Sequence, residues 1–391
     1  MYSTVLYATF ALGFITQVLL IRVSSIELYS LYVILAAIIA IVKVTLLTKT
    51  SELFLRSSTS DSGYKQYKTY LVSIDFILLS ISGFLISIIL YFSNYELNVL
   101  SLIILILIFP ASSGFNINKN KFILFNSMDD LTIMEFLIGL MRLAVLPYAA
   151  SYDQLSILLA GVLFLRVSEN VLSMIMTSKF TLKNDTNINV AYDKKTASYS
   201  LLRTFSKQSF SESEVILLSL FASAKEIVLY KIAKTLAHIT TVIQQPIWRR
   251  LQPKIYKSSK TNNESINRIV RSGIVLSLFT SSPIIIIFSL FGEKLISMLY
   301  GEQFIDAYFV CLILIVGKII FATNLGWYKI WSINTSFSWF TPVPYIAGLI
   351  SMLVLAFILK PESAYIFSII SLFSYVVAIA ISFYGLLALK K

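Results

Sequence analysis

Twelve apolar runs follow one another along this chain of 391 residues, and only one long polar stretch interrupts them. An α-helix rises 1.5 Å per residue, so that about 20 apolar residues cross the hydrocarbon core of a bilayer. Because 57% of the residues are hydrophobic and only 13% are charged, no soluble domain of ordinary size remains outside the runs. None of the runs has the alternating pattern of a half-buried strand. The sequence therefore predicts an all-α integral membrane protein with twelve transmembrane helices.

The predicted spans form two sets of six. They cover residues 4–21, 28–47, 69–92, 98–112, 131–149 and 154–176, and then 211–224, 225–248, 270–290, 307–326, 338–358 and 364–388. Two equal sets on either side of a polar linker are typical of transporters built from two helical lobes. We therefore predict an N-terminal six-helix lobe (1–177), a cytoplasmic linker (178–210) and a C-terminal six-helix lobe (211–391) around a central cavity. Hydropathy alone supports the equivalence of the two halves.

Lysine and arginine are distributed unequally between alternate loops. The even-numbered loops and the C-terminus hold 22 of them, whereas the odd-numbered loops hold 4. Basic residues accumulate on the cytoplasmic side of membrane proteins, so both termini are predicted to be cytoplasmic. This placement, and not affinity for nucleic acid, accounts for the formal net charge of +12.

The eighth predicted span carries a polar stripe. At 100° per residue, Lys231, Lys234, His238 and Gln245 fall on one face of the helix, with Gln244 beside them. A charge that faces lipid at mid-membrane costs about 2.5–3.5 kcal/mol even on the mildest scale. The stripe therefore predicts a water-accessible cavity that suits an anion. Snorkelling of Lys231 to the interface and simple packing of His238 remain open alternatives.

Four more basic residues lie inside predicted spans. Arg142, Arg166 and Lys318 are near the middle of the fifth, sixth and tenth spans, whereas Lys43 is near the end of the second and is expected to snorkel. Glu135 and Glu169 lie in the fifth and sixth spans, and an ion pair between Arg166 and Glu169 at i, i+3 is an open structural alternative. The eighth and tenth spans have no acidic residue at that depth, so a net positive cavity is expected.

Three passages resemble signatures of the Wzx-type O-antigen flippases of the multidrug/oligosaccharidyl-lipid/polysaccharide (MOP) superfamily. LLIRVSSIELYSLYVI (19–34) is similar to the family's turn after its first helix, and LYKIAKTLAHITTVIQQPIW (229–248) resembles its eighth helix. LFGEKLISMLYGEQFIDAYFV (290–310) is similar to the segment between its ninth and tenth helices. Near the start of the seventh span, where the family often carries aspartate, this chain has Glu214.

The resemblance implies a flippase of the bacterial inner membrane that moves an undecaprenyl-diphosphate-linked oligosaccharide, the O-antigen repeat unit of lipopolysaccharide, by alternating access. It also implies an O-antigen polymerase and a chain-length regulator as partners. The predicted diphosphate-binding residues of the cationic cavity are Arg142, Arg166, Lys231, Lys234 and Lys318. The candidates for polar lining or for coupling to an H⁺ or Na⁺ gradient are Glu135, Glu169, His238, Gln244 and Gln245. No other cofactor and no metal is expected.

Other function classes remain to be weighed. A drug or cation antiporter of the same superfamily would be expected to have an acidic cavity, and a lipid II flippase resembles a plan of fourteen helices. A polytopic O-antigen polymerase or ligase would carry a large outward loop with catalytic residues, whereas here the longest loops are cytoplasmic. With a single histidine and a single cysteine, Cys311, the chain shows no catalytic or metal-binding set, and we predict no enzyme. The sequence leaves open which sugars are moved and whether they belong to O-antigen or to another surface glycan.

Overall fold

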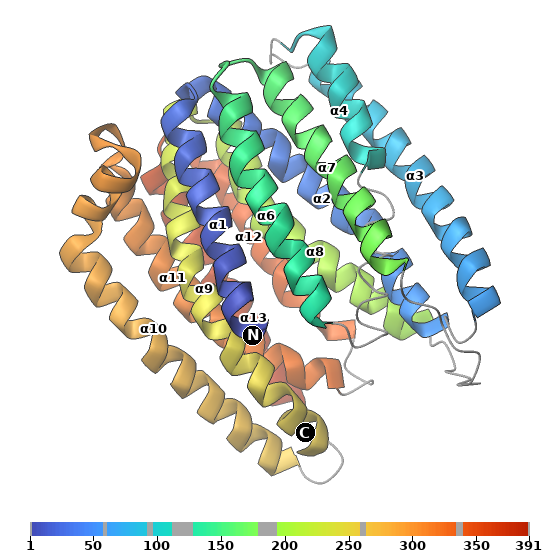
Figure 1. Cartoon of the computed structure of the whole chain (residues 1–391). Helices are drawn as coiled ribbons and strands as arrows, with labels where there is room; N and C mark the ends of the chain where they lie inside the picture. The colour runs from blue at the N-terminus through green and yellow to red at the C-terminus, as the bar shows by residue number, and fades with distance from the viewer. Residues whose placement is uncertain are drawn as a thin grey trace. The chain divides into compact units, whose positions relative to one another are not determined.

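The computed structural model describes residues 2–57, 61–91, 97–111, 128–178, 194–258, 263–333 and 339–389. Within these ranges the chain forms twelve α-helices and no strand, which confirms the predicted all-α fold (Figure 1). The first six are α1 (Tyr2–Val23), α2 (Ile26–Ser57), α3 (Asp61–Tyr91), α4 (Val99–Ala111), α6 (Met128–Ala150) and α7 (Leu155–Thr177). The others are α8 (Lys194–Ser219), α9 (Ala224–Ser258), α10 (Asn263–Tyr300), α11 (Ala307–Ile333), α12 (Val343–Leu359) and α13 (Ala364–Leu389), with the short 3₁₀ turn η1 (Glu302–Phe304) before α11.

Most of these helices are apolar enough to lie in a membrane. In the described residues, five segments have the length and hydropathy of a full span, and five shorter helical segments are also apolar. Neither α8 nor α9 is among them. In α9 the reason is the polar stripe, because Lys231, Lys234 and His238 lower the mean hydropathy of the otherwise apolar stretch between Glu226 and Gln244.

The seventh predicted span differs in its bounds from the helix at that position. The prediction covers residues 211–224, whereas α8 begins at Lys194 and ends at Ser219. Residues 194–210, predicted as linker, are therefore helical. The part of α8 before residue 210 is largely polar and carries Arg203 and Lys207, and a hydropathy pattern detects apolar stretches and not helices as such. At the other end, the amide of Ala222 donates to the carbonyl of Leu218 at 2.9 Å in the turn that follows α8.

The contacts divide the chain into two compact units. The N-terminal unit comprises residues 1–32 and 39–197, and the C-terminal unit comprises residues 33–38 and 198–391. Three helix pairings of the N-terminal unit recur in the C-terminal unit (Figure 1). The pairing of α3 with α4 corresponds to that of α10 with α11, the pairing of α4 with α7 to that of α11 with α13, and the pairing of α6 with α7 to that of α12 with α13. The third, fourth, fifth and sixth helices of each half thus pack in the same order. This shared packing gives the two halves a structural equivalence beyond their hydropathy.

In each unit a carboxylate accepts a hydrogen bond at a helix start. In the N-terminal unit, Asp153 in the α6–α7 turn accepts from the backbone amide of Ser25 at 2.9 Å, and Ser25 itself caps α2 through its hydroxyl. In the C-terminal unit, Glu226 in the first turn of α9 accepts from the amide of Ala364, the first residue of α13, at 2.7 Å. These bonds satisfy amides that have no partner inside their own helix.

Candidate functional site

The predicted site residues form two separate clusters, one in each unit. In the N-terminal unit, Glu169 of α7 joins the two predicted arginines. Arg166 Nη1 lies 2.7 Å from Glu169 Oε2, and Arg142 Nη2 of α6 lies 3.0 Å from Glu169 Oε1. The Glu169 side chain is only 5% exposed, whereas those of Arg142 and Arg166 are 41% and 26% exposed. One buried carboxylate therefore holds two arginine side chains that remain partly exposed.

Local sequence and helix packing produce this cluster together. Arg166 and Glu169 are three residues apart on α7, so they lie on one face of the helix, and the pair that the sequence offered as an alternative is present. Arg142 comes from α6, which packs closely against α7. A Cβ atom on Gly161 of α7 would lie 3.1 Å from the Cβ of Ala149 of α6, so the missing side chain allows the close approach of the helices.

The arginine cluster lines a pocket of about 250 Å³. Its lining comes from three helices of the N-terminal unit: Thr9 and Gly13 of α1, Glu135, Ile138, Gly139 and Arg142 of α6, and Arg166 and Glu169 of α7. A Cβ atom on Gly13 would meet no atom within 4 Å, so the wall beside it is open. The Thr9 hydroxyl donates to the carbonyl of Val5 at 3.0 Å, which directs its proton toward its own helix. The two arginines are therefore the cationic donors of this pocket lining.

Lys43 belongs to the same electrostatic environment. Its positive charge acts on Glu169 in the same direction as those of Arg142 and Arg166. The helix α2 continues to Ser57, and the apolar segment of this helix that could cross a membrane ends at Lys43. Snorkelling of Lys43 from the end of that segment stays a prediction.

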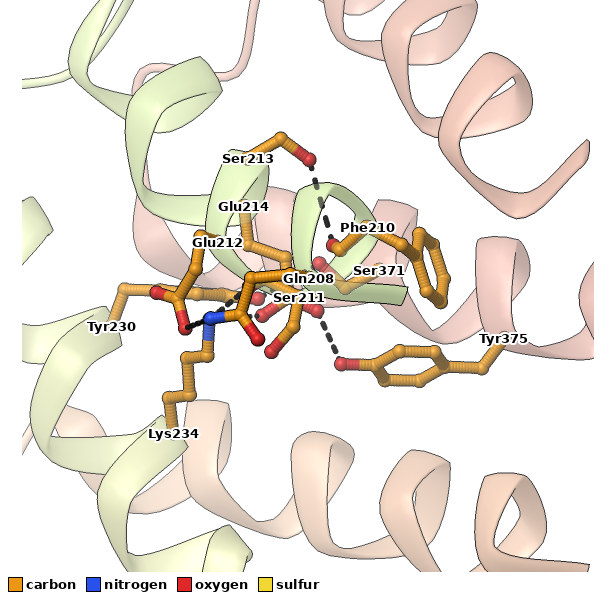
Figure 2. Close-up of polar contacts among 10 residues, drawn as sticks. All are labelled: Gln208, Phe210, Ser211, Glu212, Ser213, Glu214, Tyr230, Lys234, Ser371 and Tyr375. Carbon is orange, nitrogen blue, oxygen red and sulfur yellow. Dashed lines mark hydrogen bonds and ion pairs between the residues drawn. The ribbon is translucent and has the colours of Figure 1, made fainter. Parts of the chain in front are cut away.

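In the C-terminal unit the central group is Glu214 of α8, which is fully buried. Lys234 Nζ of α9 lies 2.9 Å from Glu214 Oε2 and also donates to the backbone carbonyl of Ser211 (Figure 2). The hydroxyl of Tyr375 from α13 donates to Glu214 Oε1 (Figure 2). Beside them, the hydroxyls of Tyr230 and Ser371 are 2.9 Å apart. Three helices thus meet at one buried carboxylate.

Tyr375 also positions a second lysine. The ammonium of Lys318 of α11 lies 4.7 Å from the centroid of the Tyr375 ring, within the range of a cation–π contact. The ring fits against Gly317, where a Cβ atom would come within 2.7 Å of it, and packs edge-to-face on Phe210 at 5.5 Å. Lys318 therefore contacts this cluster through the face of the Tyr375 ring, whereas Lys234 forms an ion pair with the carboxylate of Glu214.

The polar stripe of α9 does not form the uniform cationic face that the sequence predicts. Lys234 is buried and ion-paired, Lys231 is partly exposed and His238 is exposed. Gln244 is buried and its side-chain amide donates to the hydroxyl of Ser281 in α10 at 2.6 Å. The side chain of Gln245 lies outside the described residues.

The expectation of an unneutralised positive charge at Lys234 is wrong, because the neighbouring helix α8 supplies Glu214. In the sequence, Glu214 stands out only because it lies near the start of the seventh predicted span, where the family that the chain resembles often carries aspartate. Because α8 begins earlier than predicted, Glu214 lies well inside this helix and level with Lys234. Among the described residues, no group of three or more His, Cys, Asp or Glu side chains is arranged to hold a metal ion.

Comparison with known proteins gives the fold. No protein-family model matches the sequence, and no curated protein matches it. Several solved structures do match over nearly the whole chain. One is an inward-facing multidrug resistance MATE family transporter of the MOP superfamily, with a TM-score of 0.74, 10% identity, and coverage of 98% of this chain and 94% of that chain. An outward-facing MATE family transporter matches with a TM-score of 0.61, 12% identity, and coverage of 100% and 96%.

The chain therefore has the all-α membrane fold of the MOP superfamily transporters. The lipid II flippase MurJ in an inward closed conformation shares this fold, with a TM-score of 0.71, 13% identity, and coverage of 98% of this chain and 87% of that chain. Both the drug-transporter branch and a lipid-flippase branch are thus similar in fold to this chain.

Proposed function

We propose that this chain is a flippase that moves an undecaprenyl-diphosphate-linked oligosaccharide, of the kind used as an O-antigen repeat unit, across the bacterial inner membrane by alternating access. The observation that carries the proposal is the arginine cluster. Arg142 and Arg166 lie on apolar helices, remain partly exposed, and line an open pocket. A diphosphate cannot enter hydrocarbon without cationic partners, and guanidinium groups bind phosphate oxygens in pairs. The fold shared with a lipid II flippase and the resemblance in three passages of the sequence support the same substrate class.

A drug or cation antiporter is the competing function, since MATE transporters share the fold. Such a protein needs a carboxylate that its cationic substrate can reach. Here the buried carboxylates Glu169 and Glu214 are each engaged by cations of the chain itself, Glu169 by two arginines and Glu214 by Lys234. At Glu169 and Glu214 this arrangement disfavours the binding of a cationic substrate. It also disfavours Glu169 as a coupling group for H⁺ or Na⁺, because each of its oxygens already accepts from an arginine.

Transport in proteoliposomes tests the proposal. The probe is a prenyl-diphosphate-linked oligosaccharide with a fluorescent sugar, and a membrane-impermeant quencher reports which leaflet it occupies. We expect the chain to equilibrate the probe between leaflets, and we expect Arg142→Ala and Arg166→Ala to slow this at least tenfold, since each removes a charge-assisted bond of about 1.5–3 kcal/mol. Arg271→Ala, an exposed arginine of α10, is the matched control and should transport normally.

Two outcomes would count against the proposal, the first against the transport itself and the second against the role of the arginine pocket in it. One is that the chain leaves the lipid-linked probe in its original leaflet but extrudes a cationic dye in exchange for protons. The other is that both arginine variants transport at the rate of the control, in which case the cationic pocket takes no part. Resistance of cells to cationic drugs upon expression of the chain provides an independent measurement of the competing function.

A further inference from the structure

The pocket of the N-terminal unit has two chemically different ends. Glu135 and Arg142 are seven residues apart on α6, which is almost two helical turns, so they lie on one face and about 10 Å apart along the axis. Gly139 lies between them on the same face and contributes no side chain. One end of the pocket therefore presents Arg142 with Arg166, and the other presents the carboxylate of Glu135.

The arginine end suits a phosphate group. A guanidinium group carries five N–H donors, and the structure shows one hydrogen bond from each of Arg142 and Arg166, both to Glu169. The remaining donors of the two groups match the oxygens of a phosphate, which arginine binds through paired hydrogen bonds. Because Glu169 engages both groups at once, it fixes how far apart they stand. Glu169 is thus a positioning residue for the two arginines.

The Glu135 end suits hydroxyl groups. A carboxylate repels a second phosphate, but it accepts hydrogen bonds at about four positions and can bind neighbouring hydroxyls even when other groups also contact it. The volume of about 250 Å³ gives room for a phosphate group with an attached sugar ring. The open wall beside Gly13 provides the room for the ring.

We infer that this pocket binds a glycosyl phosphate: Arg142 and Arg166 bind its phosphate, Glu135 binds hydroxyls of the attached neutral sugar, and Glu169 positions the arginines. The inference rests on the proposed function, because it names the part of the lipid-linked glycan that the N-terminal unit recognises. A water-soluble sugar phosphate offers the same chemistry as the lipid headgroup. The experiment therefore includes both.

Binding to the full-length protein in detergent tests the inference by titration calorimetry. The probes are inorganic phosphate, glucose 1-phosphate and glucuronic acid 1-phosphate. We expect glucose 1-phosphate to bind about tenfold tighter than inorganic phosphate, which corresponds to about one net hydrogen bond to a charged group. Glucuronic acid 1-phosphate should bind more weakly than glucose 1-phosphate, because its carboxylate faces Glu135. Equal affinity for all three probes would overturn the assignment of the sugar to Glu135.

Variants separate the two ends of the pocket. Arg142→Ala and Arg166→Ala should weaken inorganic phosphate and glucose 1-phosphate alike by about tenfold or more. Glu135→Ala should abolish the preference for glucose 1-phosphate and leave phosphate binding intact, whereas Glu135→Gln, which still bonds to hydroxyls, should keep the preference and gain affinity for glucuronic acid 1-phosphate. If Glu135→Ala weakens both probes equally, Glu135 does not contact the sugar and the inference fails.

Three further variants test the position of the ligand and the role of Glu169. Gly13→Leu adds a side chain toward open space, so it should fill the pocket and abolish binding of both phosphates without changing any charge. For the positioning role, Glu169→Gln should weaken phosphate binding and Glu169→Asp should restore part of it at equal thermal stability. Unchanged binding in Gly13→Leu would place the ligand elsewhere and overturn the inference. Arg271→Ala is again the control.

The source of the ligand and the proposed function are distinguished by a lipid-linked probe. Farnesyl-diphosphate-linked glucose should bind and compete with glucose 1-phosphate if the pocket receives a lipid headgroup. If it does not compete, the pocket serves a soluble sugar phosphate, and the inference that it recognises part of the lipid-linked glycan is overturned. If glucose 1-phosphate binds as predicted but the proteoliposomes transport no glycan, the flippase proposal fails and the pocket stands. If glycan transport is unchanged in Gly13→Leu and Arg142→Ala, the pocket inference fails and the flippase stands.

Discussion

Replacing Glu214 with glutamine should strongly destabilise the C-terminal unit. The side chain of Glu214 is 0% exposed and that of Lys234 only 11% exposed, and the pair is 2.9 Å apart. Glutamine keeps the shape of the side chain and removes its charge, so that Lys234 stays buried without a counter-charge. The hydroxyl of Tyr375 loses a charged acceptor in the same step.

The expected loss is about 3 kcal/mol. Breaking a buried ion pair by removing one partner costs about 3–5 kcal/mol, and the lower end applies because the carbonyl of Ser211 still accepts from Lys234. For a unit of this size, each kcal/mol lowers the apparent melting temperature by about 2–4 °C, so Glu214→Gln should lower it by about 6–12 °C. The double variant Glu214→Gln with Lys234→Met removes both charges and should recover most of this loss, because apolar replacement of a whole buried pair is often neutral.

The chain contains its own reporter for this measurement. Cys311 is the single cysteine of the sequence, and it is buried in α11, which packs against α9. A thiol-reactive dye that fluoresces on coupling therefore follows the unfolding of the C-terminal unit. Asp306→Asn is the matched control, because it breaks an exposed ion pair with Lys225 at 3.6 Å, and such pairs contribute about 0–1 kcal/mol.

Two results would refute the reasoning. If Glu214→Gln lowers the melting temperature no more than Asp306→Asn does, Lys234 is not desolvated in the folded protein. If the double variant is as unstable as the sum of the two single variants, the two side chains contribute independently, and the contact at 2.9 Å carries no coupling energy.

Three further predictions concern single positions. Gly13→Ala should raise the stability of the N-terminal unit by about 0.5–1 kcal/mol, measured by the thermal loss of far-ultraviolet circular dichroism, because the new methyl group meets no atom within 4 Å and alanine favours the helix. Gly317→Ala should cost about 1–3 kcal/mol in the thiol-dye assay, because its Cβ would lie 2.7 Å from the ring of Tyr375. The backbone amide of Ser25 lowers the pKa of the exposed carboxyl of Asp153, so this bond stabilises the fold above the unfolded pKa and is lost as the pH falls through the folded one. Asp153→Asn should therefore melt slightly below the parent at neutral pH and together with it in acid.

The sequence predicts those features of this chain that depend on neighbours along one helix. Apolar runs of the right length place α1, α4 and α7 within one or a few residues of their observed ends, because lipid requires continuous apolar surface. The pair of Arg166 with Glu169 is also predictable, since residues three apart share a helix face. The helix ends and this ion pair both depend on the geometry of a single helix, and the spacing of residues in the sequence gives that geometry.

Features that depend on contacts between helices are the ones that the sequence does not reveal. Nothing in the spacing of Arg142 indicates that it joins Glu169, because the contact depends on how closely α6 and α7 approach. Glu214 and Lys234 come from different helices, and Tyr375 joins them from a third, 141 residues after Lys234. An excess of lysine over acid within single helices therefore does not predict a free positive charge.

The two clusters differ in the chemistry that their cations leave available. In the C-terminal unit, Lys234 has three donors and the structure shows two of them bound, one to Glu214 and one to the carbonyl of Ser211. In the N-terminal unit, Arg142 and Arg166 have five donors each, and the structure shows one hydrogen bond from each to Glu169. Beyond these bonds, an anion finds one further donor on Lys234, whereas it finds four further donors on each of the two arginines. The same arrangement, a buried carboxylate between cations, thus holds α8, α9 and α13 together in one unit and positions the arginines of the proposed phosphate site in the other. This difference is why we assign the anion to the arginines and not to the whole set of five cations that the sequence suggested.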